Sequence, residues 1–379
     1  MEAYLDNAAT TMVDKKVVEA MLPFFSSEYG NPNSLHEFGQ KAKEAVYKAR
    51  EYISKSINCD MNEIVFNSGG TEGDNHAIKG VAYAQKEKGK HIITSKIEHP
   101  AVIQTCKALQ KEGYEITYLG VDEFGFINLD DLKKAIRKDT ILVSIMFANN
   151  EIGTIQKVKE IGKICKEKNV YFHTDAVQAL GKVKIDVKDM KIDLMSTSSH
   201  KIHGPKGMGF LYIKKGVKVS NIIDGGGQEY GKRSGTVNTP GIIGMAKALE
   251  LMFEPNDMFK LRDKLIKGLL EIPNSKLNGP KKDRLSNNVN VVFKYIEGES
   301  ILLYLSEEGI SVSTGSACSS NSLEPSKVLL SIGLKPEQSH GSIRVSLSRY
   351  TTEEQVDYFL EKIKVVVEKL RKMSPFKGD

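Results

Sequence analysis

Short apolar strands alternate with helical patterns over the first two thirds of the chain, and this alternation restricts the fold more than any other feature. The expected strands cover residues 63–66, 91–94, 116–119, 141–147 and 192–195. Amphipathic helical patterns lie between them, for example at residues 129–136 and 158–168. Strands joined through helices pair in parallel, with helices on both faces of the sheet. The sequence therefore predicts an α/β fold whose large domain holds a mostly parallel, doubly wound sheet.

The pattern changes near residues 254–257, where Pro255 ends one helical segment and Asp257 begins the next. Beyond this point, expected strands such as 288–293 and 343–347 mix with helices, the last at 353–372. A chain of 379 residues is long enough for two hydrophobic cores. We predict a large domain over residues 14–256 and a smaller α+β domain made of residues 257–379 together with residues 1–13.

Charge and hydropathy exclude several classes of protein. The formal net charge of +6 comes from lysines scattered among acids, without a basic block that would follow a nucleic acid. No apolar run approaches the length that crosses a bilayer. The first residues lack the basic and apolar segments of a signal peptide. We expect a cytoplasmic protein that binds neither nucleic acid nor membrane.

The four cysteines show no C-x-x-C pair and no zinc-ligand spacing, so neither a disulfide framework nor a structural metal site is expected. Cys106 and Cys165 lie inside helical patterns, where a cysteine is usually a small buried hydrophobe. Cys318 differs, because it lies in a polar, glycine-containing loop over residues 313–322 with no apolar face to bury it.

Lys201 lies in a turn rich in hydroxyl and imidazole groups, residues 196–207, between two expected strands. Ligands of open α/β sheets gather beyond the carboxyl ends of the strands. A partly desolvated lysine there can act as a nucleophilic amine. The alternative is an ordinary surface lysine of a basic protein.

Ser68-Gly69-Gly70-Thr71 follows the expected strand 63–66 and opens a helix. Free backbone N–H groups and the positive end of a helix dipole bind phosphate at such a position. An ordinary helix cap explains the motif equally well. Pro100 suits the first turn of the next helix and makes His99 its expected cap. Ser34 is the expected cap of a helix that runs to about residue 57, and Thr352 with Gln355 forms an expected capping box for the last helix.

Asp175 ends another expected strand, so its carboxylate needs a cationic partner or it would become neutral. A salt bridge would satisfy it, and so would a protonated ring nitrogen. A phosphate site, a buried acid and a strand-end lysine together fit pyridoxal 5'-phosphate, with Lys201 binding the aldehyde and Asp175 the pyridinium.

Several motifs, in order along nearly the whole chain, carry a family resemblance. They are Leu5-Asp6-Asn7-Ala8-Ala9-Thr10-Thr11, Ser68-Gly69-Gly70-Thr71-Glu72, Glu98-His99, Asn149-Asn150-Glu151, His173-Thr174-Asp175-Ala176-Val177-Gln178, Ser198-Ser199-His200-Lys201, Arg233-Ser234-Gly235-Thr236, Ser316-Ala317-Cys318-Ser319 and Ile343-Arg344-Val345-Ser346-Leu347. Together they resemble the cysteine desulfurases, class V aminotransferase relatives of the pyridoxal-phosphate fold type I. The loop around Cys318 is similar to that of the long-loop subgroup, which includes the nitrogen-fixation and iron–sulfur-cluster enzymes.

The resemblance implies a role for each matching residue. Lys201 would hold the cofactor as a Schiff base and move protons, while His99 would stack on the pyridine ring and assist acid–base steps. Asp175 would pair with the ring nitrogen and Gln178 would contact the ring hydroxyl. Further cofactor contacts would come from Gly70, Thr71, Asn150, Ser198, Ser199 and His200, and from Thr236 of the partner subunit in a homodimer.

The resemblance also implies the reaction. Arg344 and Asn150 would bind the carboxylate of L-cysteine, and a guanidinium suits this bidentate task. Cys318 would attack the substrate sulfur and emerge as a persulfide, leaving L-alanine. The sulfur would pass to an iron–sulfur scaffold or another acceptor protein, and Cys318 is a candidate ligand of a cluster shared with that scaffold. The alternatives are a selenocysteine lyase, an aminotransferase of the same fold, and a non-catalytic sulfur carrier.

Overall fold

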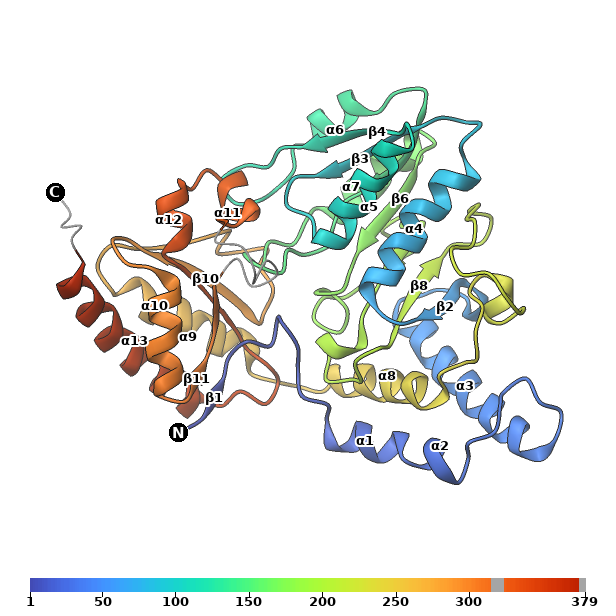
Figure 1. Cartoon of the computed structure of the whole chain (residues 1–379), viewed down its shortest axis with the longest axis horizontal. Coiled ribbons are helices and arrows are strands. Elements are labelled where there is room, and N and C mark those ends of the chain that lie inside the picture. The colour runs from blue at the N-terminus through green and yellow to red at the C-terminus, as the bar shows by residue number, and fades with distance from the viewer. Residues whose placement is uncertain (315–323, 375–379) are drawn as a thin grey trace.

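The computed structural model describes residues 1–314 and 324–374. Its centre is a seven-stranded sheet in the order β2-β8-β7-β6-β5-β3-β4 (Figure 1). The strands are β2 (Ile64–Asn67), β3 (His91–Ser95), β4 (Glu115–Leu119), β5 (Thr140–Ser144), β6 (Tyr171–Asp175), β7 (Leu194–Ser196) and β8 (Gly209–Ile213). β8 pairs antiparallel with both neighbours, and the other paired strands run parallel. The predicted mostly parallel sheet is confirmed.

Helices cover both faces of this sheet because its strands are apolar on both sides. Ile93 and Val143 belong to one buried cluster, whereas their neighbours Ile92 and Leu142 belong to another. The first cluster includes residues of α3 (Glu37–Ser56), α7 (Val158–Glu167) and α8 (Thr239–Met252). The second includes residues of α4 (Gly70–Ala84) and α5 (Pro100–Lys111). Two-sided burial is the property expected of a doubly wound sheet.

A four-stranded antiparallel sheet, in the order β12-β13-β10-β9, forms the centre of a second hydrophobic core. Its strands are β9 (Ser275–Leu277), β10 (Asn288–Phe293), β12 (Ser313–Thr314) and β13 (Ser342–Ser346). The helices around it are α9 (Met258–Leu270), α10 (Gly298–Glu307) and α13 (Glu353–Met373), with the short α11 (Lys327–Ser331) and α12 (Pro336–His340) nearby (Figure 1). The predicted domain limits stay a prediction.

The start of the chain packs with this second core. β1 (Ala3–Tyr4) pairs in parallel with β11 (Ile310–Ser311), and Ala3 and Leu5 are buried in the cluster (Figure 1). From there the chain passes to α1 (Lys15–Met21), α2 (Pro23–Ser26) and α3 beside the large sheet (Figure 1). Residues 5–14 therefore connect the two cores.

Two predicted helix caps are confirmed and one is wrong. His99 caps α5, where its Nδ1 accepts from the Ala101 N–H at 3.1 Å, and Thr352 caps α13 in a capping box. The helix expected to start at Ser34 begins at Glu37 instead, capped by His36. The Ser34 N–H donates to the Asn31 carbonyl, so Ser34 belongs to a preceding turn. No helix within the two described ranges is long and apolar enough to cross a membrane.

Candidate active site

The segments that carry the predicted site residues follow strands that run in the same direction. β8 lies between β2 and β7 and runs antiparallel to both, so β2 has the same direction as β7 and the strands parallel to it. One edge of the sheet therefore holds the carboxyl ends of β2, β3, β5, β6 and β7. The turn before α4, His99, Asn150, Asp175 and Lys201 all lie at these carboxyl ends or just beyond them. This edge is where ligands of open α/β sheets bind.

Lys201 ends a short 3₁₀ turn, η2 (Ser199–Lys201), and its amine contacts the beginning of the chain. Nζ donates to the Ala8 carbonyl at 2.7 Å and to the Ala9 carbonyl at 2.6 Å. The backbone of Thr11 donates to the His200 carbonyl at 3.0 Å. Residues 8–11 are therefore a wall of the site, which the sequence pattern showed only through the family motif.

Asp175 and His99 form the charged centre of the site together with Asp74. The nearest ligand atoms of these three side chains lie within 4.8 Å of one another. Burial raises the pKa of Asp175, whereas the charges of His99 and Lys201 lower it. Burial and the neighbouring Asp175 raise the pKa of Asp74 well above its usual range. Burial therefore opposes ionisation of both carboxyl groups, and more strongly at Asp74 than at Asp175.

A buried, neutral histidine lies next to this centre. His173 is fully buried, and its two ring nitrogens lie 2.9 Å from the hydroxyls of Ser144 and Ser196. Burial lowers the pKa of His173 to about 3, so it is uncharged at neutral pH.

The sequence reasoning missed Asp74. The signal was its place one helical turn after Gly70, on the same face of α4.

The glycine turn before α4 forms a small cavity of about 310 Å³. Gly69 adopts φ 138°, a conformation that favours glycine. A Cβ on Gly70 would lie 2.6 Å from Val177 Cγ2, so this position also requires glycine. The cavity is lined by Thr10, Ser68, Gly69, Gly70, Thr71, Glu72, Ser198, His200, Lys206 and Gly207.

The cavity suits a phosphate group in both shape and charge. It lies at the N-terminus of the 15-residue helix α4, where backbone N–H groups and the helix dipole attract anions. His200, whose Nδ1 lies 3.0 Å from Thr10 Oγ1, is neutral because burial and the nearby Lys201 lower its pKa to about 4. Ser199 lies elsewhere, fully buried against Gly204.

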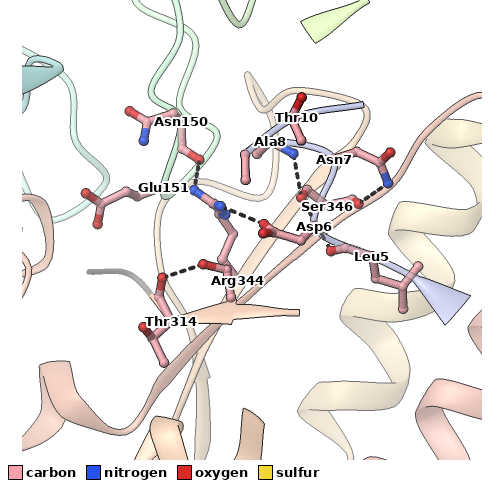
Figure 2. Close-up of polar contacts among 12 residues, drawn as sticks. Leu5, Asp6, Asn7, Ala8, Thr10, Asn150, Glu151, Thr314, Arg344 and Ser346 are labelled. Atoms are coloured by element: carbon pink, nitrogen blue, oxygen red, sulfur yellow. Dashed lines mark hydrogen bonds and ion pairs between the residues drawn. The ribbon is translucent and has the colours of Figure 1, made fainter. Parts of the chain in front are cut away.

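Arg344, on β13, lies across from the large sheet and is only 2% exposed. Its Nη2 donates to Asp6 Oδ1 at 2.7 Å and its Nη1 to the Asn150 carbonyl at 3.3 Å (Figure 2). The structure thus brings together Arg344 and Asn150, which belong to different cores. Asn150 also lines a cleft of about 620 Å³ together with Glu98 and Ser326.

Gln178 lies beside the Lys201 contacts, since its Nε2 donates to the same Ala8 carbonyl at 3.0 Å. Lys182 Nζ in turn donates to the Gln178 carbonyl at 3.2 Å, and burial lowers the pKa of Lys182 to about 7. Thr236 lines a different cavity of about 240 Å³, which shares Ser68 and Gly207 with the first.

Cys318 lies outside the described residues. The strand that precedes its loop is nevertheless informative, because β12 pairs with β13 so that Ser313 opposes Arg344. The chain therefore enters residues 315–323 from a position next to the arginine of the site.

Comparison with known proteins agrees with this arrangement. A family model described as aminotransferase class-V matches residues 3–359. The chain is 58% identical, over its full length and 97% of the relative, to cysteine desulfurase IscS of Clostridium botulinum. It is 57% identical to the IscS of Methanosarcina thermophila, over 98% of this chain and 93% of the relative.

Two solved structures also superpose closely on this chain. A NifS-like protein superposes with a TM-score of 0.92 at 42% identity, covering 98% of this chain and all of the other. A structure of SspA in complex with cysteine superposes with a TM-score of 0.84 at 38% identity, covering 92% of this chain and all of the other.

Proposed function

The chain belongs to the aminotransferase class-V family, and from this premise we propose that it is a pyridoxal-phosphate-dependent cysteine desulfurase. It would convert L-cysteine to L-alanine and transfer the sulfur to Cys318. The observation that carries the proposal is the meeting of an amine, a buried carboxylate, an anion cavity and a buried arginine at one edge of the sheet.

The residues present fit pyridoxal 5'-phosphate. Gly70, Thr71, Ser198 and His200 would hold the phosphate in the cavity before α4. Asp175, which is buried, would face the ring nitrogen, and Lys201 would bind the aldehyde. When bound, the cofactor supplies an electron sink for cleavage of bonds at the substrate α-carbon.

The substrate side of the site is built from Arg344, Asn150 and His99. The Arg344 guanidinium would bind the cysteine carboxylate. Burial lowers the pKa of His99 and the nearby Asp175 raises it, and this imidazole would exchange a proton with the substrate. The amine of Lys201, whose charge acts on both His99 and Asp175, would move protons at the substrate carbons.

Sulfur transfer needs a thiolate nucleophile, which we assign to Cys318. The Cys318 sulfur attacks the substrate sulfur, the carbon–sulfur bond breaks, and a proton replaces sulfur on the substrate β-carbon. Cysteine and one enzyme thiol thereby become alanine and one enzyme persulfide, with no other oxidant or reductant. The acceptor of the persulfide sulfur would be an iron–sulfur scaffold or another protein.

The test is to assay the purified protein with L-cysteine, pyridoxal phosphate and a thiol reductant, and to measure alanine and sulfide. We expect equal amounts of the two products. A keto acid in place of alanine would instead identify an aminotransferase, and no product at all would leave a sulfur carrier. Parallel assays with L-selenocysteine would show which of the two substrates is preferred.

We also propose that two copies of the chain form a dimer. Large apolar side chains are exposed around α1–α3, including Leu22 (56%), Phe25 (62%), Tyr29 (65%) and Leu35 (93%). Monomers rarely expose such a group together. Light scattering is expected to give twice the mass of one chain. In the double variant Leu35→Asp, Phe25→Asp the measured mass is expected to fall toward that of a single chain. A monomeric wild type would refute the dimer.

A further inference from the structure

The guanidinium of Arg344 is held by two different segments of the chain (Figure 2). Asp6 binds Nη2 at 2.7 Å, and the Asn150 carbonyl binds Nη1 at 3.3 Å. Among the described residues, no partner contacts the buried Nε. A guanidinium carries five N–H groups, and these two contacts occupy two of them. Counting only contacts with residues 1–314 and 324–374, three donors therefore remain for a second carboxylate.

Asp6 is itself fixed in place by the strand that carries Arg344. Its backbone forms a bridge to Ser346, two residues beyond Arg344 on β13. The following residues continue this contact, since Asn7 Nδ2 donates to the Ser346 carbonyl at 2.9 Å and the Ala8 N–H to Ser346 Oγ at 2.8 Å (Figure 2). The Asp6 carboxylate is therefore presented to Arg344 by a backbone that is already ordered.

The charge of Asp6 also matters. The Arg344 side chain is 2% exposed and the Asp6 side chain 20% exposed, so the pair is largely shielded from water. A buried cation without a partner is strongly destabilising, and its side chain would turn toward any other acceptor. Asp6 removes this penalty before substrate arrives and fixes the direction of the guanidinium.

We propose that Asp6 is a positioning residue for recognition of the substrate carboxylate. It holds one side of Arg344 so that the remaining N–H groups are aimed at the carboxylate of the incoming amino acid. This inference rests on the proposed function, in which that amino acid is cysteine. It also assigns a role to the Leu5-Asp6-Asn7 segment, whose next residues bind Lys201.

The test compares Asp6→Ala with Asp6→Asn in the cofactor-loaded enzyme. Asp6→Ala removes the acceptor, and we expect the KM for cysteine to rise on the order of tenfold to a hundredfold while kcat changes less. Asp6→Asn keeps an oxygen that can accept from Nη2 but lacks the negative charge, so its KM is expected to lie between those of Asp6→Ala and the wild type. Should Asp6→Ala not fold, Asp6→Ser, whose side chain is too short to reach Nη2, takes its place.

Two further arms separate positioning from general damage. Glu254→Ala removes the acid that pairs with Arg349, an arginine whose side chain is only 10% exposed. This matched control is expected to leave KM unchanged. Cysteamine lacks a carboxylate, so the change it causes in the cofactor absorbance is expected to have the same concentration dependence in Asp6→Ala as in the wild type.

An unchanged KM in Asp6→Ala, or an equal weakening for cysteamine and cysteine, would overturn the role of Asp6. Failure of the proposed function has a different signature, because the wild-type enzyme itself would then form no alanine from cysteine.

Discussion

Replacing Lys201 with alanine is expected to abolish turnover of cysteine, with a loss of at least about 10²–10⁴-fold. The variant loses both the amine that binds the cofactor aldehyde and the base that moves protons at the substrate. It also leaves the carbonyls of Ala8 and Ala9 without the donor that contacts them at 2.7 and 2.6 Å. The purified variant is expected to lack the visible absorbance of the covalently bound cofactor.

The assignment is checked directly by reducing the wild-type protein with borohydride and locating the fixed cofactor by peptide mass spectrometry. We expect it on the peptide that contains Lys201. Lys215→Ala is a matched control, because Lys215 is an exposed lysine just after β8. Cofactor fixed to another lysine, or wild-type turnover in Lys201→Ala, would disprove the role of Lys201.

Replacing Cys318 with serine is expected to stop formation of alanine and sulfide while the cofactor absorbance is retained. A hydroxyl at this position is not ionised at neutral pH and cannot accept sulfur as a persulfide. Adding cysteine should still change the absorbance of the bound cofactor, because the binding residues Arg344 and Asn150 are untouched. Turnover at the wild-type rate would show that another group takes the sulfur.

The three cysteines among the described residues provide the controls. Burial raises the pKa of Cys59 and of Cys106 to about 12, and it raises the pKa of Cys165 as well. All three are therefore protonated thiols at neutral pH and react slowly with iodoacetamide. Alkylation is expected first at Cys318, with loss of turnover, whereas Cys59→Ser is expected to remain active.

Local patterns were sufficient to predict the sheet and the positions of Asp175 and Lys201, whereas most other site residues were implied by the family resemblance. The cap at His99 depends on the adjacent Pro100, and the capping box of Thr352 on a residue three positions away. Such signals lie within one turn of helix, so the sequence contains them in full. The parallel arrangement of strands then places their carboxyl ends, and with them Asp175 and Lys201, at one edge.

Contacts between distant segments could not be predicted in the same way. The antiparallel direction of β8 could be read from the sequence. Only residues 197–208 connect it to β7, and they contain no helix longer than a 3₁₀ turn of three residues, which is too short for a parallel crossover. The pairing of Asp6 with Arg344 had none, since either side chain has many candidate partners. The raised pKa of Asp74 depends on burial and on the nearby Asp175, which only coordinates provide.

The contact between Asp6 and Arg344 spans 338 positions of the chain, and this has a consequence for biosynthesis. A ribosome that adds on the order of 10 residues per second makes Asp6 roughly half a minute before Arg344. The large sheet can assemble during this interval, but residues 6–8 cannot make their contacts with Ser346 until β13 has been made. A nascent chain that has a folded large sheet but lacks β13 should therefore still be without the arginine that we propose binds the cysteine carboxylate.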